Sequence, residues 1–154
     1  MLKPVVLSGN RYLDFSQRAL VMGIVNCTPD SFFPESRYPE KDAAVDAALR
    51  MIDEGADILD IGGESTRPGS LPVEQKDEEK RVIPVIEAIR KHSDIPISVD
   101  TRKAETAANA LDAGADIIND VSALRDDPLM TDLAAERDVP VVLMHMKGSP
   151  VTMQ

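Results

Sequence analysis

Polar side chains end or follow each of five short apolar runs. Carboxylate and amide groups accept and donate hydrogen bonds, so strand ends that carry them and meet at one place can bind and transform a small molecule. The apolar runs are residues 20–25, 58–61, 95–99, 117–118 with Val121, and 139–144. The polar groups are Asn26 and Thr28; Asp60 with Gly62 and Gly63; Asp100 and Thr101; Asn119, Asp120 and Ser122; and His145 and Lys147.

The elements that must position these groups alternate along the chain. Each apolar run is continuous, as expected of parallel strands that are covered on both faces. Amphipathic helical patterns lie between the runs. Four helices are predicted from apolar residues at helical spacing: Val45, Ala48, Leu49 and Ile52; Val82, Ile86 and Ile89; Ala104, Ala107, Ala108 and Leu111; and Leu129, Met130 and Leu133. Gly55 and Gly114 are predicted to end the first and third helices, and Pro84 to kink or restart the second. The fourth is predicted to begin with Asp127 as its cap and Pro128 as its first residue.

An opening hairpin is predicted from residues 4–7 and 12–15 around the turn residues Ser8, Gly9 and Asn10, followed by five strands and four helices in alternation. This order is typical of an α/β fold, and two architectures fit it: a five-stranded doubly wound sheet or the first half of a (βα)8 barrel. A doubly wound sheet uses one switch point, whereas a barrel brings all its strand ends to one mouth. Polar groups on all five strand ends favour half a barrel.

Composition excludes several classes of function. The chain has 154 residues with 17 Lys and Arg against 27 Asp and Glu, a formal net charge of −10, which disfavours non-specific binding to nucleic acid. No apolar run approaches the roughly 18 residues of a membrane span, and no signal-peptide pattern opens the chain. The single cysteine, Cys27, cannot form an internal disulfide, which indicates a reducing compartment and predicts a cytoplasmic location.

Four segments together resemble dihydropteroate synthases. Segment 22–32 reads Met-Gly-Ile-Val-Asn-Cys-Thr-Pro-Asp-Ser-Phe, and segment 60–69 reads Asp-Ile-Gly-Gly-Glu-Ser-Thr-Arg-Pro-Gly. Segments 98–101, Ser-Val-Asp-Thr, and 118–122, Ile-Asn-Asp-Val-Ser, are less specific and are shared with other pterin-binding barrels. The resemblance runs from about residue 9 to residue 148. It implies a TIM (β/α)8 barrel of the α/β class, represented by its N-terminal half: a β-hairpin, four βα units and a fifth strand.

The resemblance implies an enzyme of folate biosynthesis, a transferase. Members of this family join (7,8-dihydropterin-6-yl)methyl diphosphate to 4-aminobenzoate and release diphosphate, and they are the targets of sulfonamides. One partial pterin-binding barrel domain is expected over residues 1–154, truncated after its fifth strand. The family's later Asp, its Lys-containing loop and its Arg-x-His motif have no counterpart here, so we expect the chain alone to be inactive. The resemblance allows a homodimer when the protein is full length.

The resemblance assigns Asn26 to Mg²⁺, because a neutral carbonyl oxygen suits this hard cation, whose other ligands would be diphosphate oxygens and water. Thr66 and Arg67 match substrate contacts, and the planar fork of Arg suits diphosphate. The alternatives are that Asn26 caps its turn and that Arg67 is a solvated loop residue. Residues 33–36, Phe-Pro-Glu-Ser, depart from the glycine-rich stretch of many family members and predict a stiffer loop.

Asp100 and Asn119 match the pair that binds the pterin, and Met144 matches an apolar contact to it. Asp100 is also the expected catalytic group, since its charge would stabilise the electron-poor pterin CH2 as diphosphate leaves. The alternatives are that Asp100 caps a helix beginning near Arg102, that Asn119 is a turn residue, and that Met144 is plain core. Asp60 is expected either to orient Asn26 or Arg67 or to be an ordinary carboxylate that lies behind the site residues or in a turn.

Two residues carry weaker signals. Cys27 is expected to be buried and inert, because no basic partner adjoins it in the sequence. His145 is a weak signal, because histidines at strand ends are often only hydrogen-bonded. Two other functions stay open at this point: a pterin-binding methyltransferase barrel, which the two phosphate-oriented loops disfavour, and a non-catalytic half-barrel that acts as a binding module.

Overall fold

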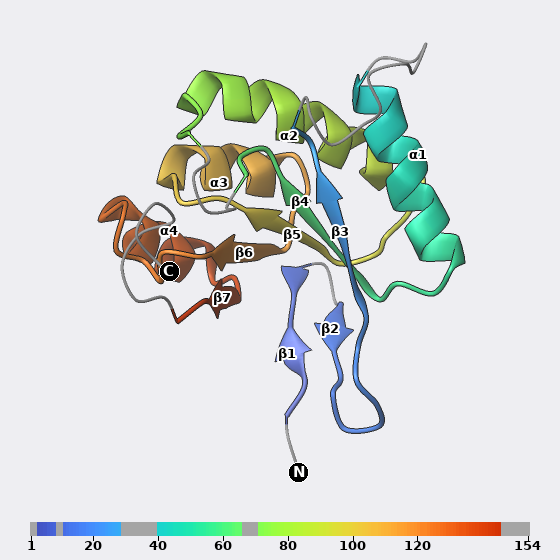
Figure 1. Cartoon of the computed structure of the whole chain (residues 1–154). Coiled ribbons are helices and arrows are strands. Elements are labelled where there is room, and N and C mark those ends of the chain that lie inside the picture. The colour runs from blue at the N-terminus through green and yellow to red at the C-terminus, as the bar shows by residue number, and fades with distance from the viewer. Residues whose placement is uncertain (1–2, 9–10, 29–39, 66–70, 146–154) are drawn as a thin grey trace.

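The structure is a computed structural model that describes residues 3–8, 11–28, 40–65 and 71–145. A five-stranded parallel sheet forms its centre (Figure 1). Its strands are β3 (Met22–Asn26), β4 (Ile58–Gly62), β5 (Ile97–Asp100), β6 (Ile117–Asp120) and β7 (Val141–Leu143), and they lie side by side in the order of the chain. All five lie at or close to the predicted apolar runs.

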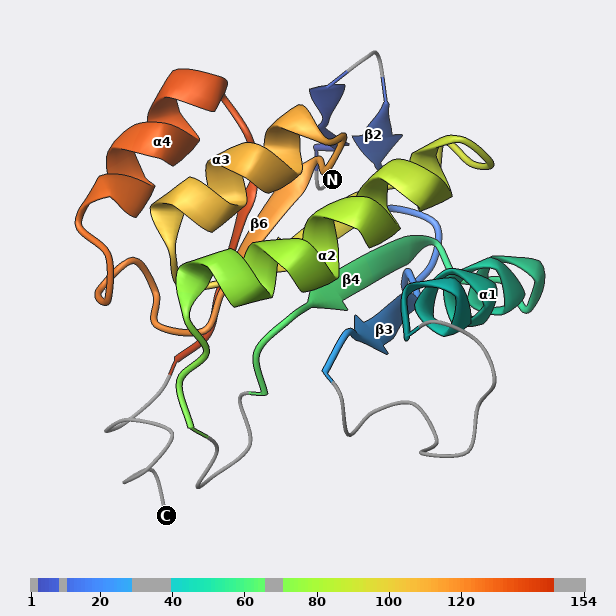
Figure 2. The same ribbon diagram turned by 90° about the horizontal axis from the view of Figure 1, so that it is seen from above.

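Four helices connect the strands and cover one face of the sheet (Figure 2). They are α1 (Glu40–Asp53), α2 (Gln75–Arg90), α3 (Ala104–Asp112) and α4 (Leu129–Arg137), and each contacts the next. A doubly wound sheet reverses its strand order and carries helices on both faces. Among the described residues neither feature occurs, so the arrangement is the one expected for part of a (βα)8 barrel.

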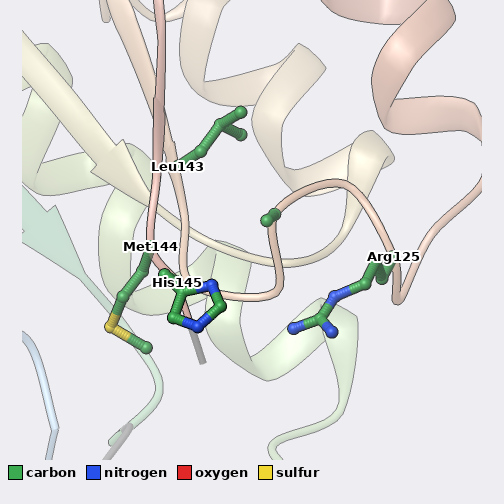
Figure 3. Close-up of a pocket in the computed structure, with 5 residues that line it drawn as sticks. Arg125, Leu143, Met144 and His145 are labelled. Carbon is green, nitrogen blue, oxygen red and sulfur yellow. The ribbon is translucent and has the colours of Figure 1, made fainter. Parts of the chain in front are cut away.

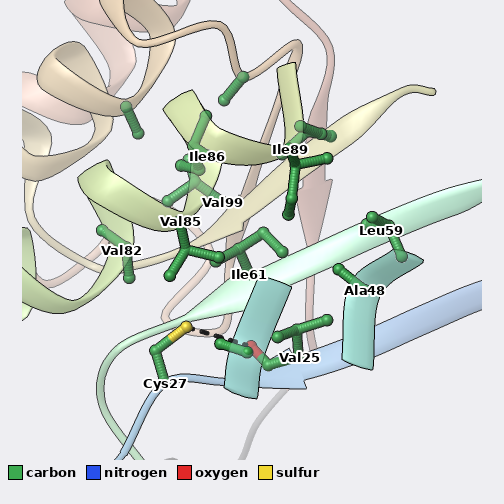
Figure 4. Packing of buried hydrophobic residues seen from close by; sticks show 14 residues of the cluster. Val25, Cys27, Ala48, Leu59, Ile61, Val82, Val85, Ile86, Ile89 and Val99 are labelled. Atoms are coloured by element: carbon green, nitrogen blue, oxygen red, sulfur yellow. Dashed lines mark hydrogen bonds between the residues drawn. The ribbon is translucent and has the colours of Figure 1, made fainter. Parts of the chain in front are cut away.

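Buried aliphatic side chains hold the helices to the sheet (Figure 4). Because successive side chains of a strand point to opposite faces, Val25, Leu59, Ile61 and Val99 face α1 and α2, and none is more than 2% exposed. Residues between them, such as Ile24 and Asp60, face the opposite side of the sheet, which none of the described helices covers and which we call the inner face. This alternation decides which polar residues can share a site.

A short antiparallel hairpin of β1 (Val5–Val6) and β2 (Tyr12–Leu13) lies at the end of the sheet where the strands begin (Figure 1). Leu7 and Leu13 pack against Ile58 and Ile117. The hairpin predicted from the sequence is therefore confirmed. The polar residues lie at the opposite end of the sheet, where the strands end.

Two helix details can be compared with the sequence prediction. Pro84 was predicted to kink or restart its helix; α2 does not restart there but runs without interruption from Gln75 to Arg90, with its buried face against the sheet. Helix α4 begins as predicted: Oδ1 of Asp127 accepts the backbone N–H of Leu129 at 3.0 Å, and Pro128 already has the helical φ and ψ of −63° and −21°. Gly55 and Gly114 end their helices with φ of +102° and +114°, as predicted. None of the described helices is long and apolar enough to cross a membrane.

Candidate functional site

Four residues form a row across the inner face at the carboxyl end of the sheet. The strand register pairs Asn26 with Gly62, Gly62 with Asp100, and Asp100 with Asn119. Paired residues of a parallel sheet point to the same side, about 4.8 Å from strand to strand. A Cβ at Gly62 would lie 3.4 Å from Cβ of Asp100, so the glycine leaves the space beside this carboxylate open. The predicted meeting of strand ends is thus present for β3 to β6.

Asp60 lies one step below this row and is buried, with 5% of the residue exposed. The Asn119 amide donates from Nδ2 to Oδ2 of Asp60 at 3.0 Å. Asp60 was expected to orient Asn26 or Arg67, or to be an ordinary carboxylate that lies behind the site residues or in a turn; within the described residues, its side chain lies behind the row and binds Asn119. Burial raises the pKa of Asp60, and the neighbouring side chains of Ser98 and Asn119 oppose this effect.

Asp100 lies in the most acidic environment of the row. Burial raises the pKa of Asp100 to about 7, and the nearby carboxylates of Asp60, Glu78 and others add to the shift. A carboxyl group with this pKa can be protonated or charged near neutral pH, and a cationic ligand would favour the charged form. Perturbed groups of this kind are concentrated at functional sites.

The capping alternative for Asp100 is wrong. Helix α3 begins at Ala104, and the residue at its cap, Lys103, makes no side-chain capping bond. The backbone N–H of Ala104 instead donates to Oδ2 of Asp127, at 2.8 Å. The Asp100 carboxyl group therefore remains available to a ligand on the inner face.

An ion-pair network of Glu64, Glu78, Arg102 and Lys103 lies near the carboxyl end of the sheet, close to the row. Glu64, which follows β4, is paired with Arg102 and Lys103, and Lys103 is also paired with the buried Glu78 at 2.5 Å. Burial alone would raise the pKa of Glu64, but hydrogen bonds from Lys103, the Val73 backbone and Arg102 outweigh it and lower the pKa. The network joins the segment after β4 to the turn after Asp100. No local sequence pattern indicated it, because its members are separated by up to 39 residues.

Asn26 is exposed at the end of β3, and within the described residues its amide makes no hydrogen bond. The same part of the chain holds no cluster of three or more His, Cys, Asp or Glu that could bind a metal. A cation at Asn26 would therefore take most of its ligands from substrate and water. This donor set fits Mg²⁺, which commonly keeps waters and binds phosphate oxygens.

The other predicted site residues have different outcomes. Met144 follows β7, is 38% exposed, and lines a pocket of about 380 Å³ with Arg125 and His145 (Figure 3). In that view Met144 and Leu143 extend to opposite sides of the strand, which places Met144 on the inner face. Thr66 and Arg67, and the divergent residues 33–36, lie outside the described residues.

Cys27 is 8% exposed and packs with the aliphatic core, where its Sγ donates to the Val25 carbonyl at 4.0 Å (Figure 4). Burial raises the pKa of this thiol to about 12, although the nearby charge of Arg81 opposes the shift. The thiolate form needed of a nucleophile is therefore scarce. The prediction that Cys27 is buried is confirmed.

Comparison with known proteins gives one consistent family. The model for pterin binding enzymes matches residues 22–154. A dihydropteroate synthase from Bacillus subtilis is 54% identical over 133 residues, which are 86% of this chain and 47% of that protein. One from Synechocystis is 46% identical over 98% of this chain and 52% of its own length. The chain spans about half the length of the curated relatives it matches.

Solved structures agree with these matches. Dihydropteroate synthase from Yersinia pestis, in a sulfonamide drug complex, superposes with a TM-score of 0.88 at 44% identity, over 99% of this chain and 54% of that one. The Xanthomonas albilineans enzyme in complex with 7,8-dihydropteroate gives a TM-score of 0.84 at 47% identity, over 94% and 52% of the two chains. The fold is therefore part of a TIM barrel, and the chain supplies about half of it.

Proposed function

Because the chain belongs to the family of pterin-binding enzymes, we propose that it supplies the N-terminal half of a dihydropteroate synthase. This enzyme would join (7,8-dihydropterin-6-yl)methyl diphosphate to 4-aminobenzoate and release diphosphate. The observation that carries the proposal is the row of Asn26, Gly62, Asp100 and Asn119 on the inner face, above the buried Asp60. A folate-synthesis function in the cytoplasm agrees with the free, buried Cys27.

Asp100 and Asn119 would hold the pterin ring. Their register pairing brings a carboxylate and an amide to adjacent strands, so both can reach one small heterocycle. The edge of a pterin presents several N–H donors and acceptors, which these two groups can satisfy together. Met144, on the same face, would add an apolar contact.

The reaction would replace a C–O bond by a C–N bond. As diphosphate leaves with the bonding electron pair, the pterin CH2 becomes electron-poor, and the 4-aminobenzoate nitrogen then attacks it and loses a proton. A fixed negative charge on Asp100 would stabilise the developing cation. The cation in turn favours the charged form of Asp100, which offsets the raised pKa that burial causes in the empty site.

Diphosphate would be held at the end of the row that Asn26 forms, away from Asn119. Asn26 would contribute one oxygen to Mg²⁺, which supplies positive charge to the leaving group. Thr66 and Arg67 would bind the same group, with the Arg guanidinium forming paired hydrogen bonds to phosphate oxygens. We further propose that the full-length protein forms a homodimer.

A test of catalysis needs a complete barrel, made by joining this chain in frame to the C-terminal half of the Bacillus subtilis relative. We call this protein the completed barrel. Asp100→Asn keeps the shape of the side chain and removes its charge, so turnover should fall by about 10–1000-fold. Circular dichroism at the same temperature checks that the variant is folded. Turnover equal to that of the unsubstituted completed barrel would refute the catalytic role of Asp100.

A second test concerns the metal. In the completed barrel, Asn26→Ala should weaken Mg²⁺-dependent binding of diphosphate and leave binding of free pterin nearly unchanged, because Asn26 reaches the metal and not the ring. Calorimetry with diphosphate, with and without Mg²⁺, measures the difference. An equal loss of pterin affinity would show that Asn26 acts by holding the fold. Pterin binding with no dependence on diphosphate or Mg²⁺ would favour a methyltransferase-type barrel.

A further inference from the structure

Asp60 is a charged residue in the middle of a buried strand. Its neighbours in β4, Leu59 and Ile61, are fully buried against the helices, so the Asp60 carboxylate points to the inner face. It lies below the row that contains Asp100 and Asn119. A carboxylate at this depth costs free energy unless polar neighbours stabilise it, so its contacts indicate what it does.

The hydrogen bond between Asp60 and Asn119 spans two strand spacings. Asp60 is in β4 and Asn119 is in β6, and their side chains meet across β5 at 3.0 Å. The β5 residue at the level of Asp60 is Ser98, whose small side chain leaves room for the contact. The sheet is therefore built so that one amide of the row reaches down to one buried carboxylate.

An ionised carboxylate only accepts hydrogen bonds, whereas an amide can present either its NH2 or its oxygen. Asn119 must therefore turn Nδ2 toward Asp60, and its Oδ1 is left on the other edge of the amide. We propose that Asp60 is a positioning residue that fixes the Asn119 amide with Oδ1 presented to the ligand, so that this position selects a heterocycle with an N–H donor. This proposal rests on the proposed function, which supplies the pterin.

Asp60 also acts on the site through its charge, and a test must separate the two effects. Its carboxylate is one of the groups that raise the pKa of Asp100. A substitution at Asp60 would therefore change the electrostatics at Asp100 even if the contact with Asn119 had no role. A double-mutant cycle isolates the contact, because any effect carried through Asn119 disappears when Asn119 is absent.

The binding experiment uses the completed barrel and a 7,8-dihydropterin that carries hydroxymethyl in place of the methyl diphosphate. Asp60→Asn lets the new amide donate as well as accept, so Asn119 is no longer held in one orientation. The Kd should rise by about tenfold, the scale of one lost hydrogen bond. In the Asn119→Ala background, adding Asp60→Asn should change the Kd by less than about twofold. Equal tenfold effects in both backgrounds would overturn the proposal.

Asp120→Asn is the matched control. Asp120 also raises the pKa of Asp100, but its carboxylate accepts from the backbone N–H groups of Ser122 and Leu124 and not from Asn119. The variant removes a comparable charge and should leave the Kd within about twofold of its original value. A loss of affinity as large as that of Asp60→Asn would assign the effect to charge and overturn the positioning role.

An NMR experiment on the 154-residue chain tests the hydrogen bond between Asp60 and Asn119 without any ligand. In a chain labelled with ¹⁵N, the Asn119 side-chain NH2 should exchange slowly with water, and Asp60→Asn should shift its resonances and speed its exchange. An unchanged Asn119 resonance would overturn the proposal. Absence of dihydropterin binding by the unsubstituted completed barrel would instead overturn the proposed function, and the NMR experiment would still decide whether Asp60 orients Asn119.

Discussion

At the scale of single residues, Asp100 makes stability depend on pH. Its pKa is about 7 in the folded chain and 3.8 in an unfolded one, so between these values the folded state holds the extra proton. The free energy of unfolding should therefore fall as pH rises from 4 to 7. Asp100→Asn should remove this dependence and stabilise the isolated chain at pH 8 by about 2–4 kcal/mol. Urea unfolding at pH 5 and pH 8 measures both effects.

The same comparison can contradict the assignment. If the slope between pH 5 and pH 8 is the same in Asp100→Asn and in the original chain, the titrating group is not Asp100. The substitution would then be neutral at both pH values.

Cys27 gives a second prediction at this scale. Because its thiol is buried and its pKa is raised to about 12, iodoacetamide at pH 8 should modify the folded chain at least about 100-fold more slowly than the urea-unfolded chain. Mass spectrometry of timed samples measures the two rates. Similar rates would mean that the core around Cys27 opens readily, and the packing shown in Figure 4 would then be wrong.

At the scale of elements, two ion pairs that share one buried carboxylate connect the hairpin and α2 to the start of the sheet. Asp116 is fully buried and is paired with Arg11 and Arg90, at 2.5 Å each. Arg90 also donates to the Gly114 and Ile95 carbonyls. Arg90→Met should lower the free energy of unfolding by about 3–5 kcal/mol, since it leaves a buried charge short of its main partner.

Arg11→Met should cost less, about 1–2 kcal/mol, because Arg90 and the Ile97 N–H still hold the carboxylate. Arg18→Met is the control: Arg18 pairs with Asp57 at the surface and is 60% exposed, so unfolding should hardly change. Urea unfolding compares the three. Equal losses in all three variants would show that burial of Asp116 does not set the cost.

Most elements could be predicted because their signals are local. Continuous apolar runs marked the five strands, and glycines marked the ends of α1 and α3. Pro84 does not restart the helix, because tertiary packing keeps α2 continuous through it. The contact of Asp60 with Asn119 was missed because it depends on strand register and on the small Ser98 between them, which no single segment shows. A charged residue inside an apolar run was the available signal.

At the scale of the whole molecule, the inner face is the open side of the chain. Ile24 is 59% exposed there and Val142 is 43% exposed, and β3 and β7 are the outer strands of the sheet. Open strand edges and exposed apolar side chains promote association. The isolated chain should therefore self-associate and show no synthase turnover, and adding the C-terminal half of a relative should reduce the association. Light scattering and product assays test this, and turnover by the pure chain would contradict it.

A pair of adjacent substitutions tests the whole-molecule arrangement most sharply. Ile24 faces the inner side and Val25 faces the helices, where it is 2% exposed. In the isolated chain, Ile24→Thr should change the free energy of unfolding by less than about 0.5 kcal/mol and should reduce self-association. In the completed barrel the same substitution should cost about 1–3 kcal/mol, because the second half of the barrel covers the inner face. Val25→Thr should be destabilising in both proteins. If Ile24→Thr destabilised the isolated chain as much as the completed barrel, Ile24 would already be buried in the chain, and the inner face would not be the surface that the second half covers.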